Sequence, residues 1–301
     1  MKKGILLVLA TAIISGFSIF INQFGVSVIN PYIFTGLKNI VVAIFICCLL
    51  LLMKDWTLLK NLSKKYWGLL IAIGLIGGSI PFLLFFKGLS LTTAAQGSFI
   101  HKTMFLYVAV LAMVFLKEKI NKKFLFGAFL LLLGNVFLLK FIPHSLGRGD
   151  LLILLATLFW AVENVISKYT LKELPSRIVI WGRMFFGSVF ILIFLATTGQ
   201  ASLISTLNSN QIIWILITSA ILFGYVITWY TGLKYIPISL ATPILLLGSP
   251  ITTFLSFVQT GTISGKQILS NGLILLGIIT ILGFGRFWKT IQKKREIYVR
   301  S

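Results

Sequence analysis

Ten apolar runs of about 20 residues each follow one another along this chain, separated by short polar connections. A helix needs about 20 mainly apolar residues to cross roughly 30 Å of hydrocarbon. The sequence therefore predicts an all-α integral membrane protein with ten transmembrane helices in the lipid bilayer. The predicted spans cover about residues 4–22, 31–53, 67–86, 91–115, 124–141, 150–171, 177–198, 212–231, 237–259 and 267–287.

Basic residues concentrate in alternate connections between the runs, chiefly in 54–65, 117–123 and 288–301. Because Lys and Arg collect in cytoplasmic loops, we expect both termini in the cytoplasm, with 288–301 as a basic tail. The expected location is the plasma membrane, or inner membrane, of the cell. The net charge of +21 is then a topological signal, and no nucleic-acid partner is expected.

The two halves of the chain resemble each other at an offset of about 145 residues, which indicates a duplication. Five spans per copy is an odd number, so the second copy must enter the membrane from the opposite side. The sequence thus predicts two inverted five-helix repeats, at 4–141 and 149–287. The matches are "LLVLAT" at 6–11 with "LILLAT" at 152–157, "KGLSL" at 87–91 with "TGLKY" at 231–235, and Lys38 with Arg183.

Inverted repeats are typical of secondary transporters, whose substrate sites lie near the bilayer midplane where the halves meet. The first span corresponds to the sixth, so we expect it to be retained and not cleaved as a signal peptide. The sequence has no G-x-x-x-x-G-K-[ST] loop. Transport is therefore expected to draw on a gradient, without a nucleotide or another cofactor.

Three stretches resemble the EamA-type branch of the drug/metabolite transporter superfamily: "KGLSLTTAAQGSFI", "LKEKINKKFLFGAFLLLLGNVFLL" and "LATLFWAVENVISKYTLK". The resemblance covers nearly the whole chain and implies ten helices and the export or exchange of small metabolites. Glu118, Gly127 and Gly134 fit the family's pattern of a glutamate that closes the fourth span before a glycine-bearing fifth. Thr262 stands where the second copy is expected to have that glutamate.

Five ionisable residues fall inside predicted spans, where a charge costs about 2.5 to 3.5 kcal/mol and needs a partner, water or a function. They are Lys38, His101, Lys102, Glu163 and Arg183. Lys102 lies about 15 Å deep, too far for its stem to reach the headgroups. Either it binds the substrate or a coupling ion, or it forms a structural salt bridge. His101 points about 100° away, toward the same site or a neighbouring carbonyl.

Glu163 is the one acid that we place well inside a span, and two roles remain open for it. It pairs with Arg183, because consecutive antiparallel helices usually neighbour each other, or it carries a proton or binds a substrate amine. If the pair forms, Lys38 and Lys102 stay uncompensated and an anionic substrate is favoured. Lys38 lies nearer to a helix end, where snorkelling is an alternative. Trp160 and Asn164 are expected to line the same pocket as Glu163.

Proline and glycine interrupt the third and ninth spans. Pro81, Pro243 and Pro250 each remove a backbone donor, which a membrane tolerates where protein or a cavity satisfies the freed carbonyl. These positions are predicted to be hinges, cavity linings or ordinary kinks. Gly74 and Gly78 form a G-x-x-x-G pattern that favours the close approach of another helix.

The predicted function is secondary active transport of a small polar metabolite, amino-acid-like or organic-anion-like, outward and by alternating access. The alternative is a membrane-embedded enzyme that acts on a lipid-linked substrate. Such an enzyme needs paired acids, a metal site or an activated nucleophile. The runs offer one acid, and His101 and His144 lie far apart, so we expect neither catalysis nor a metal site. The sequence is compatible with a homodimer.

Overall fold

The computed structural model describes residues 1–26, 28–89, 91–92, 94–137 and 147–283. Helices make up all the regular structure in these ranges, so the prediction of an all-α fold is confirmed. The predicted tail and the last residues of the fifth and tenth predicted spans lie outside the described residues.

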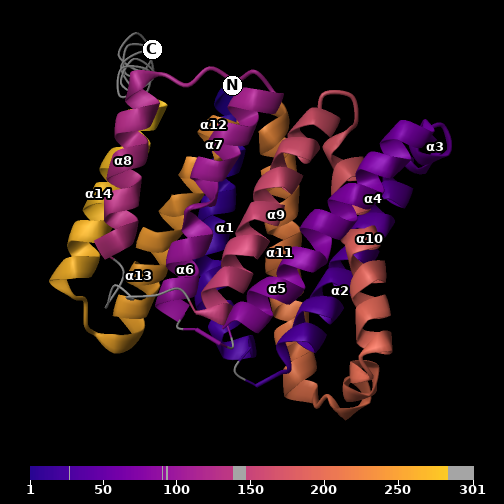
Figure 1. Cartoon of the computed structure of the whole chain (residues 1–301). Helices are drawn as coiled ribbons and strands as arrows, with labels where there is room; N and C mark the ends of the chain where they lie inside the picture. Colours follow the sequence, from indigo (N-terminus) through magenta and orange to yellow (C-terminus); the bar gives the residue numbers. More distant parts are fainter. Residues whose placement is uncertain (27, 90, 93, 138–146, 284–301) are drawn as a thin grey trace, which may run out of the picture.

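The helices follow the predicted spans closely (Figure 1). In the first half they are α1 (Lys2–Val26), α2 (Pro31–Leu52), α3 (Trp56–Lys60), α4 (Lys64–Gly78), α5 (Ile80–Leu89), α6 (Ala94–Lys102), α7 (Met104–Phe115) and α8 (Lys122–Phe137). In the second half they are α9 (Arg148–Thr170), α10 (Ser176–Thr197), η1 (Gln200–Thr206), α11 (Ser209–Tyr235), α12 (Ile238–Ile244), η2 (Leu245–Leu247), α13 (Gly248–Thr260) and α14 (Gly265–Leu282).

Nine stretches of the described residues are long and apolar enough to cross a membrane. Three of them consist of helices in series, namely α4 with α5, α6 with α7, and α12 with α13. The predicted fifth span corresponds to α8, which has 16 residues and ends where the described residues stop. The described residues thus contain nine of the ten predicted spans, and they leave the fifth untested.

The two halves run in opposite directions through the molecule. Gly4, at the start of α1, lies so close to the end of α11 that a Cβ there would come within 2.8 Å of Ile236. Lys168, at the end of α9, donates a hydrogen bond to the carbonyl of Ile236 at 2.8 Å. The start of α1 and the end of α9 therefore share one end, the amino end (Figure 1). We call the opposite end, with Gly88 and Gly149, the distal end.

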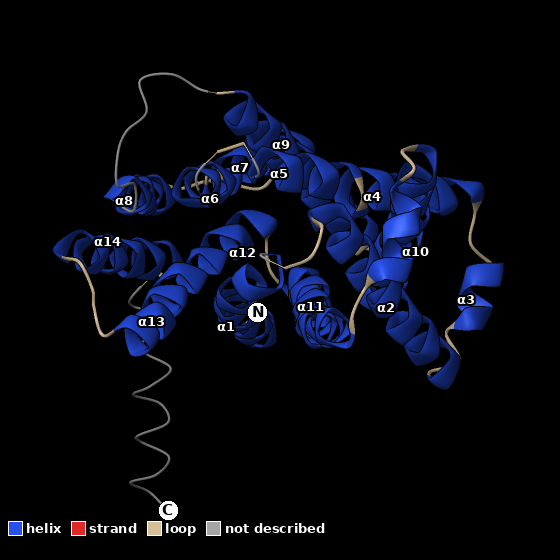
Figure 2. Ribbon diagram, turned by 90° about the horizontal axis from the view of Figure 1, so that it is seen from below, coloured by secondary structure: helices blue, strands red, loops and turns tan. Residues whose placement is uncertain are grey.

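Consecutive helices are not always neighbours in this fold. Helix α9 packs mainly on α4, α5, α6 and α7, whereas α10 packs on α2, α4 and α11. Helix α4 therefore lies between α9 and α10, as the view along the helices shows (Figure 2). On the other side of the molecule, α1 packs on α11 and α13, and α8 packs on α14.

Three spans are interrupted near their middle. The third span breaks at Ser79, two residues before Pro81, and the ninth passes through the 3-10 turn η2 directly after α12. The fourth span breaks at Thr103 without a proline, a feature that the sequence did not predict. Thr103 and Gly248, the first residue of α13, correspond at the repeat offset of about 145 residues. The fourth helix of each repeat is thus broken at nearly the same place.

Candidate functional site

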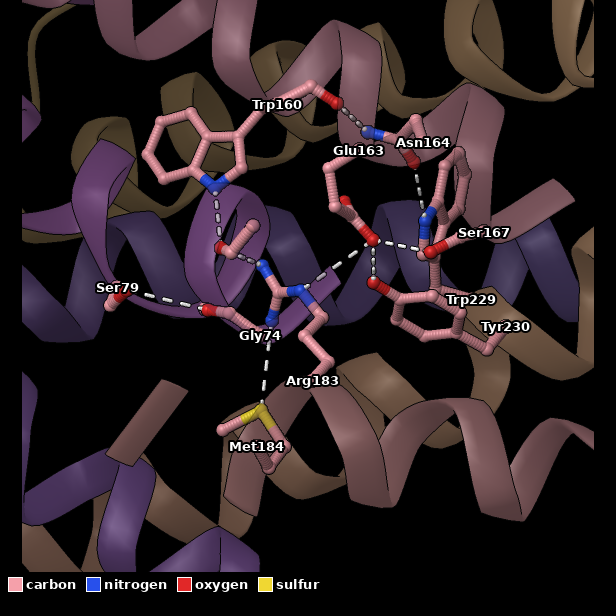
Figure 3. A network of polar contacts seen from close by, with 12 residues as sticks. Gly74, Ser79, Trp160, Glu163, Asn164, Ser167, Arg183, Met184, Trp229 and Tyr230 are labelled. Carbon is pink, nitrogen blue, oxygen red and sulfur yellow. Dashed lines mark hydrogen bonds and ion pairs between the residues drawn. The ribbon is translucent and has the colours of Figure 1, made fainter. Parts of the chain in front are cut away.

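The break in the third span frees one carbonyl, which anchors two other helices. Pro81 has no N–H, so the carbonyl of Gly77 four residues earlier lacks its helical donor. Arg183 Nη2 and Trp160 Nε1 each donate to that oxygen at 3.0 Å. Figure 3 shows both side chains reaching α4, from α10 and α9 respectively. The freed carbonyl is thereby satisfied by protein, as the membrane interior requires.

Glu163 and Arg183 meet in this network. Glu163 Oε1 lies 4.0 Å from Arg183 Nε and accepts hydrogen bonds from Ser167 Oγ at 2.5 Å and Tyr230 Oη at 2.6 Å (Figure 3). The carboxylate residue is 1% exposed and the arginine 8%. This geometry agrees with the pairing that was one of two predicted roles for Glu163.

The Glu163–Arg183 pair was predicted because consecutive helices usually lie side by side, but that is not how the pair forms. Helices α9 and α10 are separated by α4, and the glycines of α4 let the two side chains meet across it. A Cβ on Gly77 would overlap the Glu163 side chain, and one on Gly78 would overlap the Arg183 carbonyl. The predicted G-x-x-x-G pattern at Gly74 and Gly78 therefore does mark a close approach, here with α10.

Asn164 and Trp160 tie this network to α11 and to an aromatic cluster. Asn164 Nδ2 donates to the Trp160 carbonyl at 2.8 Å, and its Oδ1 accepts from Trp229 Nε1 at 3.1 Å. The Trp160 ring lies against Phe82 and Phe85, with centroids 5.2 and 5.4 Å apart. The two residues are nearly buried and join helices, so their contacts here are structural.

Lys38 forms a smaller polar network in the first half. Its Nζ donates to Asn22 Oδ1 at 2.8 Å and lies 4.7 Å from the centre of the Phe34 ring. Asn22 Nδ2 in turn donates to Ser18 Oγ at 2.8 Å. Lys38 is only 8% exposed, so it does not reach the surface by snorkelling.

These two networks occupy matching positions in the two halves. At the repeat offset of about 145 residues, Ser18 corresponds to Glu163, Asn22 to Ser167 and Lys38 to Arg183. In each half the first residue bonds the second one helical turn away. We call the set Ser18, Asn22 and Lys38 the first-half network and its counterpart the second-half network. Only the second-half network contains an acid.

His101 and Lys102 end α6 at the fourth-span break. The His101 ring lies 4.9 Å from Trp160 and 5.3 Å from Phe85, and its Nδ1 is buried with no hydrogen bond inside the described ranges. Lys102 is half-buried. Within the part of the chain that the structure describes, no hydrogen bond or ion pair reaches its ammonium, so the predicted structural salt bridge is not found there.

Asn135 supports this break, and the sequence did not single it out. Thr103 N donates to the Ile100 carbonyl at 3.1 Å instead of to Phe99. Asn135 Nδ2, on α8, donates a hydrogen bond to the Phe99 carbonyl at 2.9 Å. An amide in an otherwise apolar run was the available signal, since a buried amide needs partners.

Two acids link the halves to each other at opposite ends. At the amino end, Glu118 accepts from the backbone N–H groups of Ile238 and Ser239 at 2.9 and 3.0 Å, which caps α12. At the distal end, Asp150 accepts from Thr92 Oγ1 at 2.7 Å and Gln96 Nε2 at 2.6 Å, beside the start of α6. Asp150 thus bonds to Gln96 of α6. The second copy has Thr262, and no glutamate, at the position that corresponds to Glu118.

Thr262, which replaces that glutamate in the second copy, is exposed and bonds to Thr260 within its own turn. Gly127 and Gly134 on α8 lie against Gly277 and Ser270 of α14, where a Cβ would meet a backbone carbonyl at 2.7 and 2.9 Å. These glycines allow α8 and α14 to pack closely.

Comparison with known proteins identifies related chains. The profile of the EamA-like transporter family matches residues 2–140 and again residues 147–283. The uncharacterized transporter YoaV of Bacillus subtilis is 26% identical over 98% of this chain and 99% of its own. The uncharacterized transporter YyaM of the same organism is 26% identical over 75% and 76%. The riboflavin transporter ImpX of Fusobacterium nucleatum is 28% identical over 74% and 79%.

The fold is also found in solved structures. One crystal structure of a protein aligns with a TM-score of 0.72, over 93% of this chain and 96% of its own, at 17% sequence identity. At that identity the match shows a shared fold and nothing about the cargo.

Proposed function

The chain belongs to the EamA-like transporter family, and from this premise we propose that it is a secondary active transporter of a small anionic metabolite. The cargo is an amino acid or an organic anion, and its carboxylate pairs with Lys102. Transport is outward, across the plasma or inner membrane, by alternating access of the two halves.

The observation that carries this proposal is the state of Lys102. The other interior cations have contacts: Arg183 has Glu163, and Lys38 has Asn22. Lys102 is half-buried in a candidate span with no bond inside the described ranges. A charge in that setting favours an anionic ligand, because the membrane interior does not solvate it. His101, with its unpaired Nδ1 against Trp160, is placed to orient the same ligand.

The interrupted helices support the alternating-access part. Lys102 is the last residue of α6, at the break that matches the one before Gly248 in the other half. Broken helices at the repeat interface are where transporters hold their cargo. The relatives are named as transporters, and one of them, ImpX, is named as a riboflavin transporter.

The expected orientation places the amino end in the cytoplasm. Helices begin or end there beside Lys3, Lys65, Lys123, Lys168 and Lys234, whereas the distal end has few cations. This asymmetry follows the positive-inside rule.

Transport in proteoliposomes tests the proposal. Radiolabelled amino acids and organic acids would first be screened for transport by the unmodified protein. Lys102→Met is then expected to raise KM about tenfold or more, because a buried charge partner is lost. Lys172→Met, which removes an exposed lysine at the amino end, is the matched control and should transport normally.

Two outcomes would contradict the proposal. Normal KM and rate in Lys102→Met would remove Lys102 from the site. A transported compound recovered with an altered mass would indicate the enzyme alternative.

A further inference from the structure

The first-half network is a copy of the second-half network that lacks the acid. In the second half, Arg183 lies 4.0 Å from the carboxylate of Glu163. In the first half, Ser18 occupies the position of Glu163, and the buried Lys38 has an amide and an aromatic ring as partners. We propose that Lys38, together with Ser18, binds a small monovalent anion, a halide or a carboxylate, at the place that the Glu163 carboxylate fills in the other half.

The described acidic residues either bond to other groups than Lys38 or are exposed. The sequence has six Asp and Glu residues, and five of them are described. Asp55 pairs with Arg177, Glu118 caps α12, Asp150 holds Thr92 and Gln96, Glu163 pairs with Arg183, and Glu173 is exposed. Across these five acids, none forms an ion pair with Lys38. Lys38, a residue that is 8% exposed, therefore lacks a counter-charge within the described chain.

The donors needed to bind an anion are in place. An ammonium has three N–H donors, and Lys38 uses one of them on Asn22. Ser18 Oγ accepts from Asn22 Nδ2, and within the described residues its own hydroxyl hydrogen has no acceptor. An anion beside Lys38 and Ser18 would receive charge-assisted hydrogen bonds, the stronger kind. Asn22 connects the two donors and holds them on facing helices, α1 and α2.

The site lies on the part of α2 that is nearer to the distal end. Lys38 lies about 10 Å along α2 from Pro31, where the helix begins at that end. Lys38 lies on α2 and Lys102 on α6, and in the described residues these two helices pack on α5 and not on each other. The anion at Lys38 is thus a second ligand, distinct from the cargo at Lys102.

Thermal unfolding of the purified full chain tests this site. The melting temperature would be measured in sodium gluconate, whose anion is large, while sodium chloride or sodium acetate replaces it at constant ionic strength. A ligand that binds the folded state raises the melting temperature in a saturable way. A response to chloride identifies a halide site, and a response to acetate alone identifies a carboxylate site; each supports the proposal.

Two variants and a control make the test specific. Lys38→Met is expected to abolish the response to either anion. Ser18→Glu installs the acid of the second half, so it is expected to abolish the response and to raise the melting temperature in gluconate. Lys172→Met, at an exposed lysine, should keep the full response and so excludes a general effect of salt on the protein.

The proposal is overturned if neither anion changes the melting temperature of the unmodified protein, or if Lys38→Met responds as the unmodified protein does. If Ser18→Glu fails to fold, Lys38→Met decides alone. The result is independent of the proposed cargo site, because a Lys102→Met protein with a raised KM for transport is expected to keep the anion response.

Discussion

Arg183 donates a hydrogen bond to the carbonyl oxygen of Gly77 at 3.0 Å. That oxygen is available because Pro81 has no N–H to offer it. The break in the third span and the Glu163–Arg183 pair are therefore parts of one structure. The break supplies an acceptor for the guanidinium, and the guanidinium satisfies the break.

Gly77→Ala is expected to destabilise the protein by at least about 2 kcal/mol, because the added Cβ overlaps the Glu163 side chain on a facing helix. The melting temperature of the purified protein measures the effect. Gly68→Ala, on the same helix with open space around the new Cβ, is the control and should be neutral or slightly stabilising. Equal effects of the two substitutions would contradict the packing described here.

Glu163→Gln is expected to cost about 3 to 5 kcal/mol, because it leaves the Arg183 charge buried without its partner. Arg183→Met should cost a similar amount for the converse reason. The double variant is expected to cost clearly less than the sum, as for two residues in one network. Denaturation with sodium dodecyl sulfate gives the free energies, and strictly additive values would argue against the pair.

Asn135→Ala is expected to destabilise the protein by about 1 to 3 kcal/mol, because the Phe99 carbonyl at the fourth-span break would lose its donor inside the membrane. Asn61→Ala, at an exposed turn after α3, serves as the control. A neutral Asn135→Ala would mean that the break does not depend on α8.

Glu118→Gln is expected to cost about 1 to 2 kcal/mol. Each group that contacts the Glu118 carboxylate, at Ile238 and Ser239, is a donor, and the amide NH₂ of glutamine would face one of them. The melting temperature of the purified protein measures the change. Glu173→Gln, at an exposed acid, is the control and should leave the melting temperature unchanged. An unchanged Glu118→Gln protein would show that the cap of α12 is dispensable.

The sequence predicted the all-α fold, nine of the spans and the two-repeat architecture correctly. Burial in lipid requires long apolar runs, which can be recognised from the sequence alone. The correspondence of Lys38 with Arg183 was visible for the same reason, since ionisable residues are rare in such runs. The spacing of Gly74 and Gly78 likewise marked a close helix contact before the neighbouring helix was known.

The partners of these residues were harder to predict, because hydrogen bonds between helices depend on which helices are neighbours. Helix α4 lies between α9 and α10, an order that the sequence does not reveal. Glu163 and Arg183 do pair, as predicted, although their helices are not direct neighbours. The break at Thr103 has no adjacent proline or glycine from which it could have been predicted. The donor to the carbonyl that this break leaves free is Asn135, on another helix.

The difference between Ser18 and Glu163 means that the two halves have specialised since they were duplicated. An assembly of two first halves would have serine at both positions and no carboxylate for its buried cations. An assembly of two second halves would have Leu247, and no lysine, at the position of Lys102. Neither half alone supplies both the buried carboxylate and the lysine at the fourth-span break, so an assembly of two identical halves would lack one of these groups.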